Sequence, residues 1–275
     1  MRPGDARSHP RRRPDTGGEH RPTEVRGGRA GRHQVSLERA LSKLGFSSRS
    51  ESRLLITSGK TTVNGRVCRD PRAWVDPRRD RLSVSGNPIR PARRVAILLH
   101  KPTGIVTTRS DERGRETVYS LLPREIPYLF PVGRLDKESS GAILFTNDTR
   151  LGDSLTDPSR HVAKTYRVTL DRPLGSGDVA RFTSGVRLPT GERLRPVQVR
   201  PLAGASPEYE FILSEGKNRQ IRRMCREAGF QVLSLHRTAI GPLSLGSLAP
   251  SKYRFLTEQE IAALASAGGE RGGNA

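Results

Sequence analysis

From residue 95 onward, the apolar residues occur in short runs separated by loops, and this spacing constrains the fold more than any other feature. We predict strands at Val95–Leu99, Ile105–Thr108, Ala142–Thr146, Lys164–Leu170 and Tyr209–Leu213, because β-branched and aromatic residues are frequent there. Few long helices intervene, and the sequence has neither a GxGxxG motif nor a Gly-Lys-Ser/Thr loop. A doubly wound, nucleotide-binding parallel sheet is therefore disfavoured. The pattern predicts a mixed α+β fold in which strands dominate.

One clear helix is predicted in this region, at Asn218–Ala228. Its apolar stripe consists of Ile221, Met224, Cys225 and Ala228. A basic loop, residues 215–223, leads into the helix and places Arg219, Arg222 and Arg226 on one face. Such a face is ordinarily solvated, but beside a cleft it can bind a phosphate or a carboxylate. Both interpretations stay open at this point.

A smaller unit precedes this region, over residues 34–90. Apolar residues at helical spacing predict a first helix, and Ser48 with Glu51 forms a capping box that begins a second one. The pair Asn64-Gly65 predicts a hairpin turn, and Arg81–Ser85 a third strand. We expect two helices and a small sheet with twelve basic and five acidic residues. Residues 91–94 are predicted to be a linker.

Both ends of the chain have compositions that cannot bury a core. Residues 1–33 contain nine Arg, four acidic residues and almost nothing large and apolar, so we expect disorder there. This segment is either a solvated tail or a basic arm that contacts RNA. Residues 266–275 are predicted to be a short, Gly-rich flexible tail.

The net charge limits the class of partner. A charge of +21, from 49 Lys and Arg against 28 Asp and Glu, favours a polyanion, and nucleic acid is the first candidate. We expect no membrane span and a cytoplasmic location, because the sequence has no run of eighteen apolar residues and no apolar segment suited to a signal peptide. Cys68 and Cys225 lack CxxC spacing and nearby His, so neither a disulfide framework nor a metal site is indicated.

Two residues in the strand-rich region are candidates for chemistry. Asp136 follows Gly133-Arg134-Leu135 in a predicted loop, where a carboxylate can face a cleft. Its simpler interpretation is a helix N-cap. Tyr166 alternates with Val168 and Leu170, so it should point inward, and an inward Tyr is most often part of a core.

The unit at 34–90 resembles the small RNA-binding module first seen in the fourth protein of the small ribosomal subunit. The matching residues are Leu44-Gly45, Ser48-Arg49, Glu51, Leu55-Ile56, Gly59 and Val63-Asn64-Gly65. The resemblance implies RNA binding through the basic face of the second helix, with Arg49 and Arg53 as the first residues to test. The alternative is that both are ordinary solvated charges.

The region from 95 to 262 resembles the ribosomal RNA pseudouridine synthases of the RsuA/RluB type, which carry the same small module. The blocks that match, in order, are Lys101-Pro102-x-Gly104, Gly133-Arg134-Leu135-Asp136, Gly141, Thr146-Asn147-Asp148, Lys164-x-Tyr166 and Glu215-Gly216-x-Asn218-Arg219-Gln220-Ile221-Arg222-Arg223-Met224. Ser139 and Thr149 depart from the family pattern, which more often has Thr and Gly there. The resemblance implies a catalytic domain with a large, mainly antiparallel mixed sheet flanked by helices.

The resemblance also implies a reaction, the isomerisation of uridine within RNA, which needs no cofactor. The nucleotide must leave the base stack, and Arg134 is expected to fill the gap. Asp136 would act on the sugar as nucleophile, electrostatic stabiliser or base, and the sequence does not choose among the three. Arg222 is expected to keep Asp136 charged. Tyr166 is expected to stack on the base and relay its C5 proton, and Ile221 to wall the other side of the ring; Lys217 and Arg219 are expected to contact phosphates.

The expected partner is ribosomal RNA or an assembling subunit, and the expected state is a monomer. The form of the loop 218–223 resembles the large-subunit branch of the family more than the small-subunit branch. One rival function is a catalytically silent RNA-binding ribosome-assembly factor, against which the intact Asp136, Tyr166 and Arg222 argue. A metal-dependent nuclease is the other, and it would need clustered carboxylates or His ligands.

Overall fold

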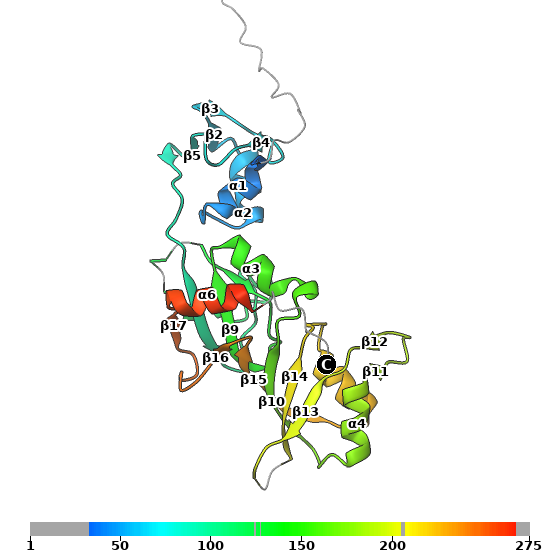
Figure 1. The fold of residues 1–275 in the computed structure, drawn as a ribbon. Coiled ribbons are helices and arrows are strands. Elements are labelled where there is room, and N and C mark those ends of the chain that lie inside the picture. Colours follow the sequence, from blue (N-terminus) through cyan, green and yellow to red (C-terminus); the bar gives the residue numbers. More distant parts are fainter. Residues whose placement is uncertain (1–32, 124, 127, 205–206, 268–275) are drawn as a thin grey trace, which may run out of the picture.

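The computed structural model describes residues 33–123, 125–126, 128–204 and 207–267 in two units, a small module and a larger domain (Figure 1). The terminal segments that the sequence predicts to be disordered or flexible lie almost wholly outside these residues. No helix in the described part of the chain is long and apolar enough to cross a membrane.

The small module contains two helices and short strands, as the sequence predicts. Its elements are β1 (Val35–Ser36), α1 (Leu37–Lys43), α2 (Arg49–Thr57), β2 (Thr61–Val63), β3 (Arg66–Val67), β4 (Trp74–Val75), β5 (Leu82–Val84) and β6 (Asn87–Pro88). The strands pair as β3-β2-β5-β6 and as β1-β4. The predicted capping box is present, because Ser48 and Glu51 each accept the other's backbone N–H. Asn64 and Gly65 both have positive φ angles, which the tight turn between β2 and β3 requires.

The larger domain is built on one mixed sheet with the strand order β13-β14-β10-β15-β9-β7-β17. The bounds are β7 (Ala96–Lys101), β8 (Phe130–Val132), β9 (Ser140–Thr146), β10 (Lys164–Leu170), β13 (Gln198–Pro201), β14 (Glu208–Leu213), β15 (Val232–Ile240), β16 (Leu243–Ser244) and β17 (Tyr253–Phe255). β8 pairs with β9, and β16 with β15. Every pairing in this sheet is antiparallel except that of β9 with β15. The predicted α+β class with a mainly antiparallel sheet is confirmed.

The parallel contact between β9 and β15 requires a glycine. Gly141 lies opposite Arg237 and has a φ of 106°, and a Cβ atom at this position would overlap the Arg237 backbone. The two strands pair over only two residue pairs, Ser140 with His236 and Gly141 with Arg237. The sheet therefore has two halves, joined at this short contact.

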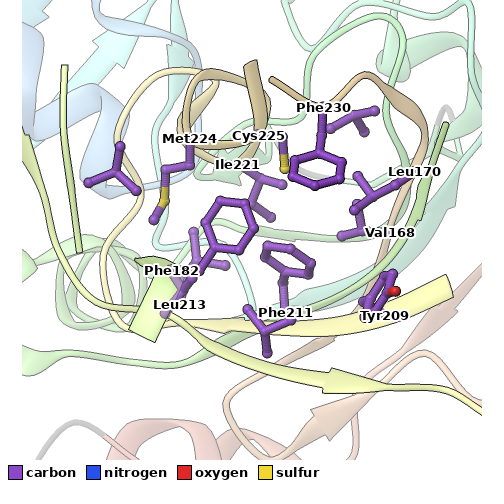
Figure 2. Close-up of a cluster of buried hydrophobic side chains, with 14 of the residues drawn as sticks. Val168, Leu170, Phe182, Tyr209, Phe211, Leu213, Ile221, Met224, Cys225 and Phe230 are labelled. Atoms are coloured by element: carbon purple, nitrogen blue, oxygen red, sulfur yellow. The ribbon is translucent and has the colours of Figure 1, made fainter. Parts of the chain in front are cut away.

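Each half of the sheet has its own buried core. The helices are η1 (Val118–Leu121), α3 (Thr149–Thr156), η2 (Pro158–Arg160), α4 (Ser176–Ser184), α5 (Gln220–Glu227) and α6 (Glu258–Ser266), and β11 (Val186–Arg187) pairs with β12 (Arg193–Leu194). α3 and α6 pack on one face of β7 and β9. α4 and α5 pack against β10 and β14, where Phe182, Phe211 and Met224 meet (Figure 2).

Two predicted elements differ from the structure. Ile105–Thr108 forms no strand beyond a single bridge from Val106 to Thr117, because Thr107 and Thr108 use their side chains to bond loop carbonyls. The predicted helix at residues 218–228 begins later, at Gln220. Arg219 precedes it with a φ of 48°, so its backbone is left-handed and outside the helix.

The small module contacts the larger domain at the start of α2. Arg109 donates a hydrogen bond to Glu51 at 3.0 Å, and its guanidinium lies over the rings of Tyr119 and Tyr128. The N–H of Tyr128 also bonds the carbonyl of Gly45 at 3.2 Å. Glu51 thus serves both the capping box of α2 and the contact between the two units.

Candidate active site

A cavity of about 570 Å³ lies where the loop before β9, strand β10 and the loop before α5 meet. Of the residues predicted to be functional, Arg134, Asp136, Tyr166, Lys217, Arg219 and Ile221 line it. Arg222 is on α5 but does not line the cavity, and Arg49 and Arg53 are on α2 of the small module. The structure therefore brings together the predicted residues of three separate sequence blocks.

Backbone contacts hold Asp136 at the edge of this cavity. The loop leaves β8 through Gly133, whose φ is 78°, and buries Leu135. The hydroxyl of Thr107 donates to the Leu135 carbonyl at 2.8 Å, and the N–H of Gly104 donates to the Lys137 carbonyl at 2.8 Å. A turn and then β9 follow, so the interpretation of Asp136 as a helix cap is wrong.

The cation nearest to Asp136 differs from the one expected. Arg219 Nη1 lies 3.5 Å from Asp136 Oδ2, while its Nη2 donates to Glu138 at 3.1 Å. Arg222, the expected partner, instead donates to the carbonyls of Val232 and Glu138 at 3.1 and 3.3 Å. The left-handed backbone of Arg219 explains the difference, because it directs this side chain to the loop and leaves Arg222 in the first turn of α5.

Tyr166 and Ile221 both line the cavity. Tyr166 is half-buried, and it packs against both of the clusters that flank the cavity. Ile221 is 3 % exposed and projects from α5 into the core in Figure 2, and it also lines the cavity. The predicted inward orientation of Tyr166, beside Val168, is confirmed.

Three cations in or beside this site, two of them buried, were not assigned a role from the sequence. Lys101 is fully buried and donates to the carbonyls of Pro102 and Ser139. Arg237 is 4 % exposed, its Nε donates to the Ala142 carbonyl at 2.6 Å, and it lines the cavity with Lys164. Burial, helped by the nearby charge of Arg237, lowers the pKa of Lys164 to about 8. Burial also lowers the pKa of Lys101 to about 8, although the charge of Asp136 acts in the opposite direction.

Sequence signals for these cations did exist. Lys101 and Lys164 belong to blocks that carry the family resemblance. Arg237 interrupts the alternation of β15, and a charge inside an otherwise half-buried strand indicates a buried polar contact.

The cations predicted to contact phosphates already have partners. Lys217 donates to the Arg193 carbonyl at 2.9 Å and lies 3.1 Å from Glu192. Arg219 is shared between two carboxylates, as described above. On α2, Arg53 pairs with Glu38 at 2.9 Å, whereas Arg49 is exposed. RNA contact by Lys217, Arg219 or Arg53 would therefore exchange one anionic partner for another.

The described residues contain no group of three or more His, Cys, Asp or Glu placed to hold a metal ion. The lining of the cavity includes the carboxylate of Asp136, the ring of Tyr166, the apolar side chain of Ile221 and several cations, together with Asp157 and Glu215.

Comparison with known proteins identifies the family. The family model described as RNA pseudouridylate synthase matches residues 95–227, and that of the S4 domain matches residues 36–77. An uncharacterized RNA pseudouridine synthase of Bacillus subtilis is 32% identical over 82% of this chain and 97% of its own length. The ribosomal small subunit pseudouridine synthase A of Salmonella typhimurium is 34% identical over 76% of this chain and 90% of its own.

A solved structure agrees with these relatives. The crystal structure of a pseudouridylate synthase superimposes with a TM-score of 0.62 and 26% identity, covering 84% of this chain and 99% of the other. The chain belongs to the RNA pseudouridylate synthase family, and it is an RNA pseudouridine synthase with an S4 domain ahead of its catalytic domain.

Proposed function

We propose that this enzyme isomerises a specific uridine of ribosomal RNA to pseudouridine, with Asp136 as the catalytic carboxylate. The observation that carries the proposal is the meeting of Asp136, Tyr166 and Ile221 in one cavity, although they lie far apart in the sequence. An S4 domain at residues 36–77 supports an RNA substrate.

The geometry supports a division of labour within the cavity. The target nucleotide leaves the base stack, and exposed Arg134 at the rim fills the space it vacates. The base then stacks on Tyr166, with Ile221 on its other side, so that its sugar faces Asp136. Tyr166 accepts or relays the C5 proton in the last step. Asp136 acts as nucleophile, electrostatic stabiliser or base.

Two arginines serve Asp136 in different ways. Arg219 lies at ion-pair distance and supports the charged carboxylate directly. Arg222 acts on the loop, since it bonds the carbonyl of Glu138 two residues after Asp136. When RNA binds, Lys217 and Arg219 can exchange a carboxylate for a phosphate, because both are partly exposed.

We propose the large-subunit RNA as the substrate, from the form of the loop 218–223. The Salmonella relative is named for the small subunit, so the small-subunit RNA is the second substrate to test. Both are assayed as transcripts and as assembling subunits.

The test is carbodiimide mapping of pseudouridine after incubation with wild type or with Asp136→Asn. We expect one new site with wild type and a rate lower by a factor on the order of 10³ or more with Asp136→Asn. Glu138→Gln is the matched control, because it removes a carboxylate from the same loop that also pairs with Arg219. Modification that survives Asp136→Asn would refute the role of Asp136, and no site in either RNA would refute ribosomal RNA as the substrate.

A further inference from the structure

The floor of the active-site cavity carries two cations that flank Tyr166. Lys164 precedes Tyr166 by two residues on β10, so both side chains lie on the same face of the sheet. Arg237 is the register partner of Tyr166 on β15, and its Cζ lies 6.0 Å from the Tyr166 ring centroid. Lys164, Tyr166 and Arg237 therefore form one continuous surface, named here the floor.

Neither of these two cations has a carboxylate partner among the described residues, unlike Lys217 and Arg219, which line the same cavity. No Asp or Glu oxygen in the described chain lies within 4.0 Å of Lys164 or Arg237. The Nη2 atom of Arg237 is buried and has no hydrogen-bond partner in the structure. A buried charge without an anionic partner is unfavourable, so buried Arg237, with half-buried Lys164 beside it, points to a negative group that arrives with the substrate.

We propose that Lys164 and Arg237 stabilise the uracil ring as an anion after it separates from the ribose. This inference rests on the proposed use of the cavity for uridine isomerisation. A base stacked on Tyr166 places its edges above the neighbouring positions of the same sheet face, which are those of Lys164 and Arg237.

The chemistry of the reaction requires such a stabiliser. When the C1′–N1 bond breaks, its electron pair stays on N1, and resonance spreads the negative charge over O2 and O4. In each possible role of Asp136, the base leaves with this pair. C5 then bonds to C1′, the C5 proton is lost to a base, and N1 takes up a proton, so that no atom is gained or lost. Fixed cations beside the ring lower the energy of the anion where it forms.

The first experiment uses 5-fluorouracil, a probe with an acidic ring and a fluorine NMR signal that reports ionisation. The pKa of the base is measured free and bound to the full-length protein. We expect the bound base to titrate at least about one unit lower, which is a tenfold preference for the anion. Lys164→Met and Arg237→Met should each remove most of this shift, and Lys164→Arg should retain it.

Lys217→Met is the matched control for the first experiment. Lys217 lines the same cavity, but it is paired with Glu192, so its removal should leave the shift in place. If Arg237→Met fails to fold, the half-buried Lys164 decides the result alone. Absence of binding by wild type, an equal pKa of free and bound base, or an equal loss of the shift in Lys217→Met would each overturn the proposal.

The second experiment separates a uracil anion from a backbone phosphate as the ligand. Salt-dependent binding of ribosomal RNA is compared for wild type and Lys164→Met. The proposal expects unchanged affinity and salt slope, whereas a phosphate contact would lower the slope by about one and weaken binding. That second result would overturn the proposal. The first experiment uses the free base 5-fluorouracil and no RNA, so its result does not depend on which RNA is the substrate.

Discussion

The rim and the floor of the cavity are both cationic, but their charges are held differently. At the rim, Lys217 and Arg219 are partly exposed and lie within 4 Å of Glu192 and of Asp136, respectively. At the floor, Lys164 and Arg237 have no carboxylate partner, and a backbone carbonyl holds Arg237. Exposed ion pairs contribute little to stability and exchange partners readily. A cation that is shielded from solvent and held in place provides positive potential at a fixed position.

This difference indicates that the cations of the rim and those of the floor serve different purposes. Under the proposed function, the rim cations exchange carboxylates for phosphates when RNA arrives, so these cations stay paired. At the floor, Lys164 and Arg237 have no carboxylate to pair with in the described part of the free protein, so their charge is available when negative charge develops on the substrate. Replacing one residue at a time in the two regions tests this assignment.

The largest expected effect is on catalysis at the floor. Lys164→Met should lower the single-turnover rate on ribosomal RNA about 10²-fold, as the loss of one preorganised electrostatic contact does in other enzymes. Rapid-quench measurement of pseudouridine formation gives this rate at saturating enzyme. A single-turnover rate within threefold of wild type would show that Lys164 contributes no more to catalysis than the rim cations do.

The next effect is an alkaline limb in the rate. The pKa of Lys164 is lowered to about 8 by burial and by Arg237, so its charge is present below pH 8 and lost above it. The rate should therefore fall about tenfold per pH unit above 8. Lys164→Arg should flatten this limb, because a guanidinium stays charged. A limb that persists in Lys164→Arg would point to Lys101, whose pKa is lowered to the same value.

Lys164→Met should also stabilise the free protein. A lysine whose pKa is lower in the folded state destabilises the fold while it is charged, so the penalty is present below pH 8 and disappears as the pH rises towards 10.5. Lys164→Met should raise the free energy of unfolding by on the order of 1 kcal/mol at pH 7. Urea unfolding at pH 7 and pH 10 measures it, and a gain that does not shrink at pH 10 would contradict the explanation.

The smallest effect is expected at the rim. Glu192→Gln releases Lys217 and Arg223 from their shared carboxylate. RNA affinity at low salt should rise a fewfold and its salt slope should steepen by up to about one, while the unfolding midpoint stays the same. Filter binding across a salt series measures the affinity. A large loss of stability would show that this pair is structural rather than exchangeable.

The sequence predicted the members of the site better than their contacts. Motif and periodicity singled out Asp136 and Tyr166, and the family resemblance gave the roles expected of them and of Ile221. The exchange of Arg219 for Arg222 beside Asp136 depends on one left-handed backbone at Arg219, which helical periodicity does not reveal.

The floor was missed for a related reason. Arg237 becomes a neighbour of Tyr166 only through the pairing of β10 with β15, which includes a register shift between Thr165 and Tyr166. No local pattern reports such a register. In the same way, the apolar run at Ile105–Thr108 resembled a strand, but its threonines hold the Asp136 loop and a neighbouring turn instead.

The short parallel contact at Gly141 has a mechanical consequence for the spacing of Asp136 and Tyr166. Asp136 precedes β9 and belongs to one half of the sheet, whereas Tyr166 lies on β10 in the other half. The separation of these two cavity residues therefore depends on how closely the backbones of β9 and β15 approach at a residue with no side chain. A methyl group at residue 141 would overlap the Arg237 backbone, so the two halves of the sheet would have to move apart.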